Sequence, residues 1–142
     1  TITRLQNMGT PDYLISAACQ LVVAQRLARR NCKDCKVPDD DVTPKVLQDL
    51  GFTAELASRV KAIKGKGCAK CSDTGYKGRQ GIYEILSVSK PLKEAILRKA
   101  TTPELREIAV KEGFQTMQDM GRRLIASGEL NFREYERVLS NE

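Results

Sequence analysis

The sequence predicts a mixed α/β fold that carries a bound metal ion. Three observations support this fold class. Helix-start signals recur along the chain, the segment 81–88 is rich in strand-forming residues, and two Cys-x-x-Cys pairs are present. The chain has 142 residues, of which 41% are hydrophobic, so it can bury a real core. This length suits one domain, or a compact domain with a piece of another.

The expected helix starts share one sequence pattern. A threonine that can cap free backbone amides precedes a proline in the first helical position, at Thr10, Thr43 and Thr102. Two further capping residues have an acid three positions later, Thr116 with Asp119 and Asn131 with Glu134. Three expected helices end at a glycine suited to a left-handed residue: Gly51, Gly113 and Gly128.

The first apolar pattern predicts a helix with one buried stripe. Its members are Leu14, Ile15, Ala18, Leu21 and Val22. The segment 22–28 that follows could extend this helix or form a strand. Apolar periodicity alone leaves both possibilities open.

The segment 81–88 reads as a strand, because it combines β-branched and aromatic residues between Gly78 and Pro91. Four short helices are expected behind it, near 91–99, 103–112, 117–127 and 132–140. Two apolar sets suggest that these helices pack on one another: Leu92, Ile96 and Leu97, and then Leu105, Ile108 and Ala109.

The cysteine pairs predict a structural zinc site. Cys32 and Cys35 form one Cys-x-x-Cys pair, and Cys68 and Cys71 form the other. Each spacing lets two thiolates reach one ion from a single turn, and two such turns complete a closed tetrahedral shell. Because no position is left open for water, the ion is expected to hold structure rather than to do chemistry.

Three other interpretations of the cysteines compete with zinc. Disulfides would suit a secreted chain, which we do not expect here because the sequence shows no signal-peptide pattern. Iron–sulfur clusters usually use tighter and less symmetric spacings. A thioredoxin-like redox pair needs one motif between a strand and a helix, whereas both motifs here lie in turn-rich segments. The fifth cysteine, Cys19, lies in an apolar stretch and is expected to be a small core residue.

The charge pattern raises a second hypothesis, a zinc-ribbon module that binds nucleic acid. The formal net charge is +6, and Lys and Arg surround both cysteine pairs. Four thiolates around one Zn²⁺ would lower this charge, and only Tyr76 and Tyr83 could stack on bases near the basic region. Nucleic acid is therefore an unlikely partner. The chain has no His, which leaves no obvious general base for a self-contained hydrolytic site.

Two short segments favour simple structural interpretations. Asp39-Asp40-Asp41 is expected to be a solvated turn, since consecutive acids rarely converge on one cation. Gly65-Lys66-Gly67 lacks the rest of a phosphate-binding loop and is expected to lead into the second cysteine turn. Gly75, Gly78 and Gly81 suit a chain that turns tightly around a metal before it enters a strand.

Several motifs occur together in this chain. They are Arg4-Leu5 with Met8-Gly9, then Ala24-Gln25-Arg26-Leu27 ahead of Cys32, then Gly67-Cys68, Gly75-Tyr76-x-Gly78-Arg79-x-Gly81-Ile82-Tyr83-Glu84, and Thr116-Met117. In this combination the chain resembles the ATPases that drive type II secretion and assemble type IV pili. The resemblance covers essentially the whole chain and concerns the C-terminal part of that family. The phosphate-binding loop, the acidic metal-binding strand and the catalytic glutamate would lie upstream of Thr1. We therefore expect a fragment that is inactive alone.

The resemblance also implies a fold and a division of the chain. Segment 22–28 would pair with 81–88 as closing strands of a RecA-like sheet. Residues 1–30 would be the last helix and strand of the ATPase core, 31–78 an inserted tetracysteine zinc module, and 79–142 the returning strand with a C-terminal helical subdomain. An insert of roughly fifty residues with little apolar content cannot hold its shape by burial alone, so a metal clip makes physical sense.

For function, the resemblance implies a subunit of a homohexamer that binds ATP with magnesium in its full-length form. Arg79 would lie beside the nucleotide, where a guanidinium can stack on adenine or pair with phosphate; a solvated arginine is the alternative. The implied location is the bacterial cytoplasm, peripheral to the inner membrane, with the platform proteins of the secretion or pilus machine as partners. Because the retraction ATPases lack the cysteine module, its presence favours secretion or pilus extension.

Overall fold

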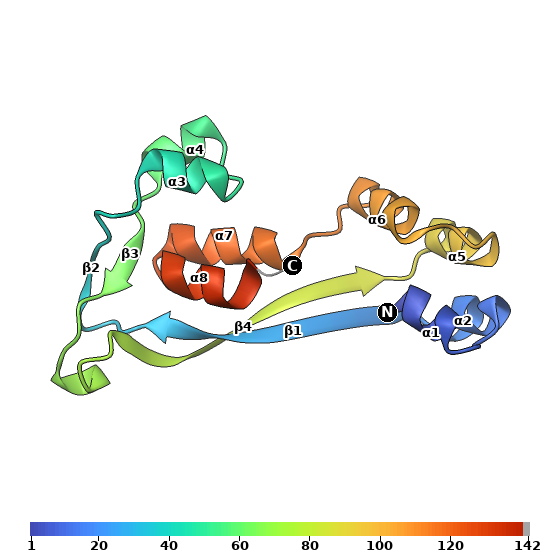
Figure 1. The fold of residues 1–142 in the computed structure, drawn as a ribbon, viewed down its shortest axis with the longest axis horizontal. Coiled ribbons are helices and arrows are strands. Elements are labelled where there is room, and N and C mark those ends of the chain that lie inside the picture. The colour runs from blue at the N-terminus through green and yellow to red at the C-terminus, as the bar shows by residue number, and fades with distance from the viewer. Residues whose placement is uncertain (141–142) are drawn as a thin grey trace. The chain divides into compact units, whose positions relative to one another are not determined.

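The computed structural model describes residues 1–140, which fold as two compact units (Figure 1). The first unit contains residues 1–24 and 84–116, and the second contains residues 25–83 together with the chain from Met117 onward. Both units contain helices and strand residues, so the mixed α/β class is confirmed. The RecA-like sheet stays a prediction, because the described residues form only two two-stranded sheets.

A long two-stranded ribbon contributes to both units. Strand β1 (Leu21–Asn31) pairs with β4 (Tyr76–Ser87). The amide of Val88 donates to the carbonyl of Gln20 at 2.9 Å, and the amide of Cys32 donates to Gly75 at 2.9 Å, so the strands are antiparallel. The ambiguous segment 22–28 is therefore a strand. The strand expected at 81–88 is longer than predicted and begins at Tyr76.

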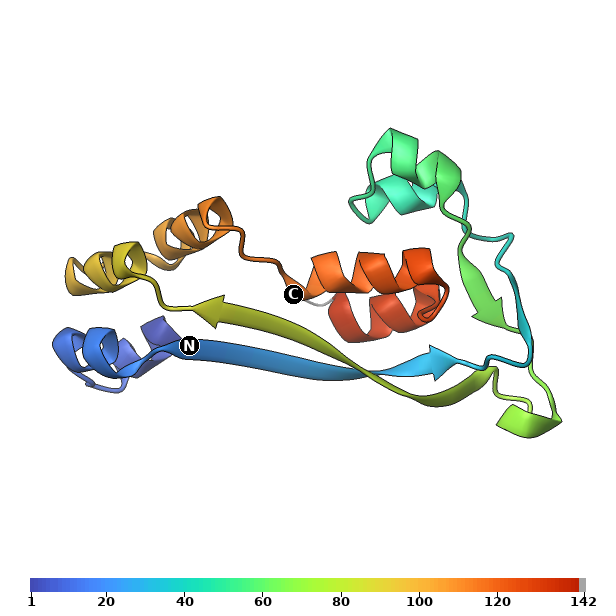
Figure 2. The ribbon, with the colours of Figure 1, turned by 180° about the vertical axis from the view of Figure 1, so that it is seen from behind.

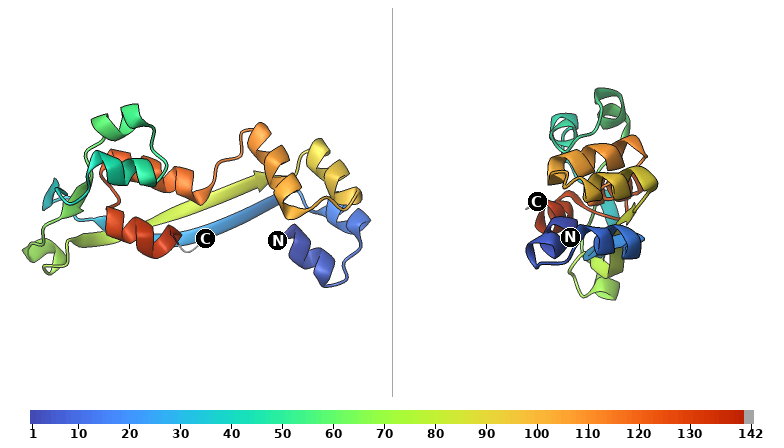
Figure 3. Two further views of the ribbon diagram at one scale, coloured as in Figure 1. Left: turned by 45° about the horizontal axis from the view of Figure 1, so that its top comes forward. Right: turned by 90° about the vertical axis from the view of Figure 1, so that its right-hand side faces the viewer.

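The first unit is built around apolar burial. Helices α1 (Ile2–Asn7), α2 (Asp12–Ala18), α5 (Lys90–Leu97) and α6 (Thr102–Lys111) supply most of its core. In both views of Figure 3, α5 and α6 lie next to each other. The core residues are Ile2, Ile15, Val88, Leu92, Ala95, Ile96, Ala100 and Leu105, with Cys19 and Ile108 packed against them. Cys19 is thus a small core residue, as expected.

Four expectations for this unit were wrong in detail. Thr10 does not cap α2: the N-cap residue is Pro11, and the helix has no side-chain cap hydrogen bond. The first apolar stripe is not one helix: α2 ends at Ala18, Cys19 is extended, and Leu21 and Val22 belong to β1. Leu97 is 53% exposed instead of packed. Helix α6 is capped one residue early, because the Thr101 hydroxyl accepts from Glu104 while the Glu104 carboxylate accepts from the Thr101 amide. Pro103 is then in the second helical position.

The second unit surrounds the cysteines with short elements. Strands β2 (Lys36–Pro38) and β3 (Ile63–Gly65) pair antiparallel. The segment that connects them contains two helices, α3 (Pro44–Asp49) and α4 (Ala54–Arg59). A 3₁₀ turn, η1 (Ala69–Cys71), precedes β4. Neither the hairpin nor α4 was predicted from the sequence. Figure 2 shows the hairpin and the helix pair from behind.

The last two helices of the second unit form an antiparallel pair. Helices α7 (Met117–Ser127) and α8 (Phe132–Leu139) lie side by side in Figures 1 and 2. They approach closely at Gly121, where an added Cβ would lie 2.5 Å from a methyl of Leu139 and 2.7 Å from the Tyr135 ring. Both helices occupy the predicted ranges. Among residues 1–140, no helix is long and apolar enough to cross a membrane.

Candidate metal centre and the adjoining arginine hollow

The four cysteines of the two motifs meet at one place in the second unit. The sulfur atoms of Cys32, Cys35, Cys68 and Cys71 all lie within 4.8 Å of one another. Cys32 directly follows β1, and Cys71 ends η1 just ahead of β4, so both motifs lie at the same end of the β1–β4 pairing. The sequence prediction that these four residues converge is confirmed.

The distances between the sulfurs match those around one tetrahedral ion. Cys32 and Cys68 are 3.8 Å apart, Cys35 and Cys71 are 3.8 Å apart, and Cys68 and Cys71 are 3.7 Å apart. A tetrahedron with zinc–sulfur bonds of about 2.3 Å has sulfur–sulfur edges of about 3.8 Å. A disulfide would require about 2.0 Å, and all five cysteines are free. The geometry therefore fits a single ion held by four sulfurs.

Backbone amides support the sulfurs from outside. Gly67 donates to the Cys35 sulfur at 3.3 Å, Cys68 donates to the Cys71 sulfur at 3.2 Å, and Gly75 donates to the same sulfur at 3.3 Å. These bonds stabilise the thiolate form that a metal requires and orient the ligands. Gly67 thus leads into the second cysteine turn, as expected for Gly65-Lys66-Gly67.

The thiols have unequal proton affinities without a metal. Burial raises the pKa of Cys35, although the amide of Gly67 opposes this. Burial acts in the same direction on Cys71, but the amides of Cys68 and Gly75 and the neighbouring sulfurs outweigh it and lower the pKa of Cys71. Binding of an ion to all four sulfurs would therefore release protons.

Two glycines let the cysteine turns close on each other. A Cβ added to Gly65 would lie 1.9 Å from the carbonyl oxygen of Gly75, and one added to Gly75 would lie 2.4 Å from that of Gly65. Gly75 also has φ of +81°, which favours glycine. Gly78 has φ of +85° but lies within β4, as Gly81 does, so of the three glycines expected to turn ahead of the strand Gly75 alone precedes it. Asp39, Asp40 and Asp41 form the expected turn, but Asp39 is not solvated as expected: its side chain is 11% exposed and lies 4.0 Å from Lys64.

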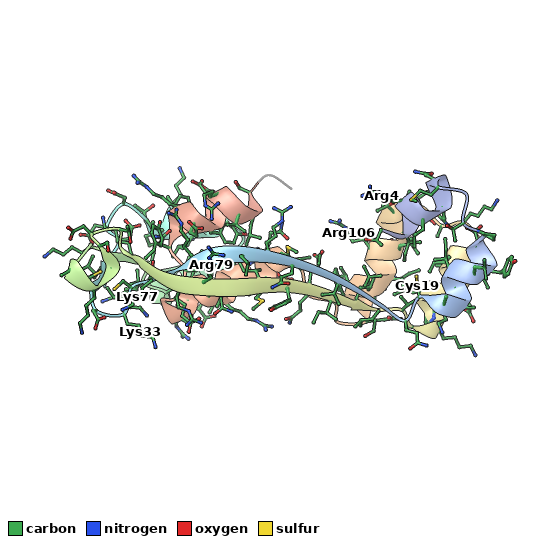
Figure 4. All side chains as sticks on the ribbon, turned by 90° about the horizontal axis from the view of Figure 1, so that it is seen from below. Arg4, Cys19, Lys33, Lys77, Arg79 and Arg106 are labelled. Atoms are coloured by element: carbon green, nitrogen blue, oxygen red, sulfur yellow. The ribbon has the colours of Figure 1, made fainter. Side chains whose placement is uncertain are left out.

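Arg79 lies on β4 beyond the second cysteine turn. It is exposed, and it lines a shallow hollow of about 290 Å³ with Arg29, Thr74, Tyr76 and Gly78. Figure 4 labels Arg79, with Lys77 and Lys33 toward the cysteine end of the ribbon. The structure contains no nucleotide, so the role of Arg79 stays a prediction.

A buried carboxylate beside this hollow was missed by the sequence analysis. Glu134 was expected to complete a helix cap, and Asn131 does accept a hydrogen bond from the Glu134 amide at 2.7 Å. The Glu134 carboxylate, however, turns to β1 and accepts from the amide of Arg29 at 3.1 Å and from its Nε at 3.0 Å. Arg137 donates to it as well, through Nε at 3.0 Å. The cap pattern was visible in the sequence, but this second use of the acid was not.

The charges around Glu134 fix its ionisation. Burial alone would raise the pKa of this fully buried carboxyl. The hydrogen bonds from Arg137 and Arg29 outweigh that effect and lower the pKa of Glu134 to about 2. Glu134 is therefore a carboxylate near neutral pH, and it ties α8 to β1.

Two more polar side chains connect the cysteine segment to the α7–α8 pair. Asn31 is fully buried and donates to the carbonyls of Ile63 at 3.1 Å and Gly128 at 3.0 Å. Arg122 of α7 donates to the carbonyl of Leu50 at 3.1 Å, at the end of α3. The side-chain nitrogen of Asn31 uses both of its donors, whereas its Oδ1 accepts no hydrogen bond from the described residues. The two side chains together hold the cysteine segment against the last two helices. No sequence motif indicated these roles.

Comparison with known protein families then identifies the chain. The family described as type II/IV secretion system protein matches residues 1–137. The chain belongs to this secretion family. Its motifs at Arg79, Cys32 and Cys68 had suggested the resemblance, which is confirmed.

Several members of the secretion family are similar in sequence to this chain along most of its length. The type IV pilus assembly ATPase PilB of Myxococcus xanthus is 35% identical over 134 residues, which cover 94% of this chain and 24% of that protein. PilB of Thermus thermophilus is 41% identical over 123 residues, covering 84% of this chain and 13% of that protein. The type II secretion system ATPase E of Vibrio cholerae is 34% identical, covering 85% and 26%. The chain thus spans about a quarter or less of the length of these relatives.

Proposed function

We propose that this chain is the zinc-binding C-terminal portion of a hexameric ATPase that powers type II secretion or type IV pilus assembly. The observation that carries the proposal is the cluster of four sulfurs at tetrahedral spacing, in a chain whose secretion-family match covers residues 1–137. The names of the relatives, pilus assembly and secretion ATPases, supply the activity.

We propose the following division of the chain. Residues 1–30 and the strand that returns after residue 79 close a RecA-like sheet, and 31–78 form a zinc module inserted between two paired strands. The pairing of β1 with β4 supports this division, because it joins the chain before the insertion to the chain after it. The helices that follow β4 form the C-terminal subdomain.

Zinc is the ion that suits this site. Four thiolates favour a soft or borderline metal, and the closed shell leaves no position for a substrate or for water. The ion would supply structural stability, which amounts to about 10 kcal/mol or more when folding and metal binding are coupled. Cys32, Cys35, Cys68 and Cys71 would hold it.

The remaining parts of the proposal concern the whole protein. Its full-length form would bind ATP with magnesium, with Arg79 beside the nucleotide, and it would assemble with neighbouring subunits of a homohexamer. It would work in the bacterial cytoplasm at the inner membrane, where platform proteins of the machine are the partners. The exposed position of Arg79 next to a second arginine supports an anion contact there.

The test uses the full-length protein and Arg79→Ala. We expect the variant to bind ATP about tenfold more weakly or to turn it over more slowly, as the loss of a charge-assisted contact predicts. Zinc content should stay at one per chain. Arg123→Ala is the matched control, because Arg123 is an exposed arginine of the same unit and does not line the hollow. Wild-type nucleotide binding and hydrolysis in Arg79→Ala would remove Arg79 from the site, and absence of any ATP hydrolysis in the full-length wild type would contradict the proposed activity.

A further inference from the structure

We propose that Arg29 is a second guanidinium contact for the phosphate groups of the nucleotide, and that Glu134 positions it; this inference rests on the proposed function. The sequence indicated a helix cap at Glu134 and no specific role for Arg29. The proposal starts from the hollow beside the cysteines, which both Arg29 and Arg79 line. Arg29 lies on β1 and Arg79 lies on β4, so the two paired strands each present one cation to it.

Arg29 is held on one edge. Its Nε and Nη2 donate to the same carboxylate oxygen of Glu134, at 3.0 and 2.9 Å, and its backbone amide donates to the other oxygen at 3.1 Å. Within residues 1–140, no hydrogen bond engages Nη1, and half of the side chain is exposed. The guanidinium therefore has a fixed orientation and an edge that is open to a ligand.

The flat face of Arg29 is also supported. Its guanidinium lies 4.1 Å from the centroid of the Tyr76 ring. The hydroxyl of Tyr76 in turn accepts a hydrogen bond from the Asn131 side chain at 2.9 Å. Tyr76 is itself a lining residue of the hollow. A carboxylate and an aromatic ring thus place Arg29 before any ligand arrives, which lowers the cost of ordering the side chain on binding.

The charges around the hollow favour an anion. Glu134 is shared between two guanidiniums, those of Arg29 and Arg137. This trio keeps one net positive charge, and exposed Arg79 adds another. Two guanidiniums near one opening match a group with several acceptor oxygens and more than one negative charge. A phosphate chain has this character, whereas a nucleobase carries no charge.

The shape of the hollow fits the same ligand class. Gly78 lines it, and an added Cβ there would meet nothing within 4 Å, so the floor beside Arg79 is open. Thr74 also lines the hollow, but its hydroxyl already donates to the carbonyl of Cys71 at 2.7 Å. The two arginines are therefore the charged side chains in the lining that can donate to a phosphate.

The experiment measures equilibrium affinities of the full-length protein for ATP, ADP and inorganic tripolyphosphate by calorimetry. For Arg29→Gln we expect affinity for ATP and for tripolyphosphate to fall about tenfold each, as the loss of one charged contact predicts. Arg123→Gln, with the same charge change in the same unit, should bind both ligands like the wild type. A loss for ATP without a loss for tripolyphosphate would overturn the phosphate assignment.

The outcomes separate this inference from the function on which it rests. If Arg79→Ala weakens ATP binding and Arg29→Gln does not, the inference is wrong and the proposed role of Arg79 stands. If neither substitution changes ATP affinity, the nucleotide contact proposed for Arg79 fails as well. Zinc content and the melting temperature of each variant are measured alongside, because Arg29 also holds Glu134.

Two further variants keep the test decisive if Arg29→Gln folds poorly. Arg29→Lys retains the charge beside Glu134 but not the planar fork, and we expect it to fold with zinc and to bind tripolyphosphate more weakly than the wild type. Wild-type affinity in this variant would overturn the inference. Glu134→Gln should weaken phosphate binding only when Arg29 is present, so the Arg29→Gln and Glu134→Gln double variant should bind no more weakly than Arg29→Gln alone. Additive losses would overturn the positioning role.

Discussion

The first unit and the zinc module, residues 31–78, are stabilised by different interactions. The first unit packs fully buried aliphatic side chains such as Leu92 and Ile96 between helices. In the zinc module one cluster consists of the four cysteines, and the other buried hydrophobic side chains described there are Leu47, Phe52, Ala57 and Ala62. A segment with few apolar residues can thus hold a defined shape when metal ligands and buried polar contacts replace a hydrophobic core.

Loss of the metal is expected to cause the largest change in stability, and it should affect the zinc module. Cys71→Ser removes the ligand that receives two amide hydrogen bonds. We expect the variant to bind no zinc and the zinc module to unfold, a loss of about 10 kcal/mol or more of metal-coupled stability. Metal analysis and circular dichroism check this.

Cys19→Ser is the matched control for the cysteine variants. Cys19 packs against the core of the first unit and lies outside the sulfur cluster. Its replacement should leave one zinc per chain. Zinc loss in Cys19→Ser, or full zinc content in Cys71→Ser, would contradict the assignment of ligands.

Removal of the buried carboxylate is the next largest expected effect in the second unit. Glu134→Ala removes a fully buried carboxylate and leaves Arg29 and Arg137, whose side chains are about half exposed, without their shared partner. We expect the second unit to lose about 2 to 4 kcal/mol of unfolding free energy, less than a fully buried ion pair would give, because water can reach both guanidiniums. Chemical denaturation followed with a probe in α8 measures it, and wild-type stability would show that the network contributes little.

Acid should remove the same contribution gradually. The pKa of Glu134 is about 2 in the folded protein against an ordinary value of 4.5. Because the folded pKa is depressed, the stabilisation is fully present above pH 4.5 and is lost as the pH falls toward about 2. We expect the stability difference between wild type and Glu134→Gln to shrink over this range. A difference that does not change with pH would contradict the ion pairing.

A cavity in the first unit should lower the stability of the region that depends on apolar packing. Leu92 is fully buried in that core, so Leu92→Ala should cost about 2 to 5 kcal/mol. Zinc content should not change, because the four cysteines of the metal site belong to the second unit. Thermal melting with metal analysis tests both statements, and loss of zinc in this variant would show that the two regions depend on each other.

The smallest predicted effect sharpens the account of the helix caps. Thr101→Ala removes the cap of α6 and should cost about 1 kcal/mol. Thr10→Ala is its control, since α2 has no side-chain cap hydrogen bond and Thr10 precedes its N-cap residue, Pro11. Denaturant titration of both variants decides this: equal losses would mean that the cap at Thr101 is not the cause.

The sequence predicted the features that depend on spacing and missed those that depend on tertiary contacts. The cysteine pairs, the four C-terminal helices and the glycine stops follow from local rules, and all are present. The limits of the first helix were misjudged, because Leu21 and Val22 fit a helical stripe until pairing with β4 makes them a strand. Glu134 reads locally as a cap residue. Only the approach of β1 from about a hundred residues away gives it Arg29 as a partner.

Hydrogen exchange of the zinc-loaded and the chelator-treated protein, resolved by peptide, tests the central claim most directly. The account predicts that removal of the metal abolishes protection in 31–78, while peptides of α2 and α5 in the first unit keep theirs. Equal loss of protection in both regions, or no change in 31–78, would contradict the claim that a metal stabilises one region and apolar packing the other.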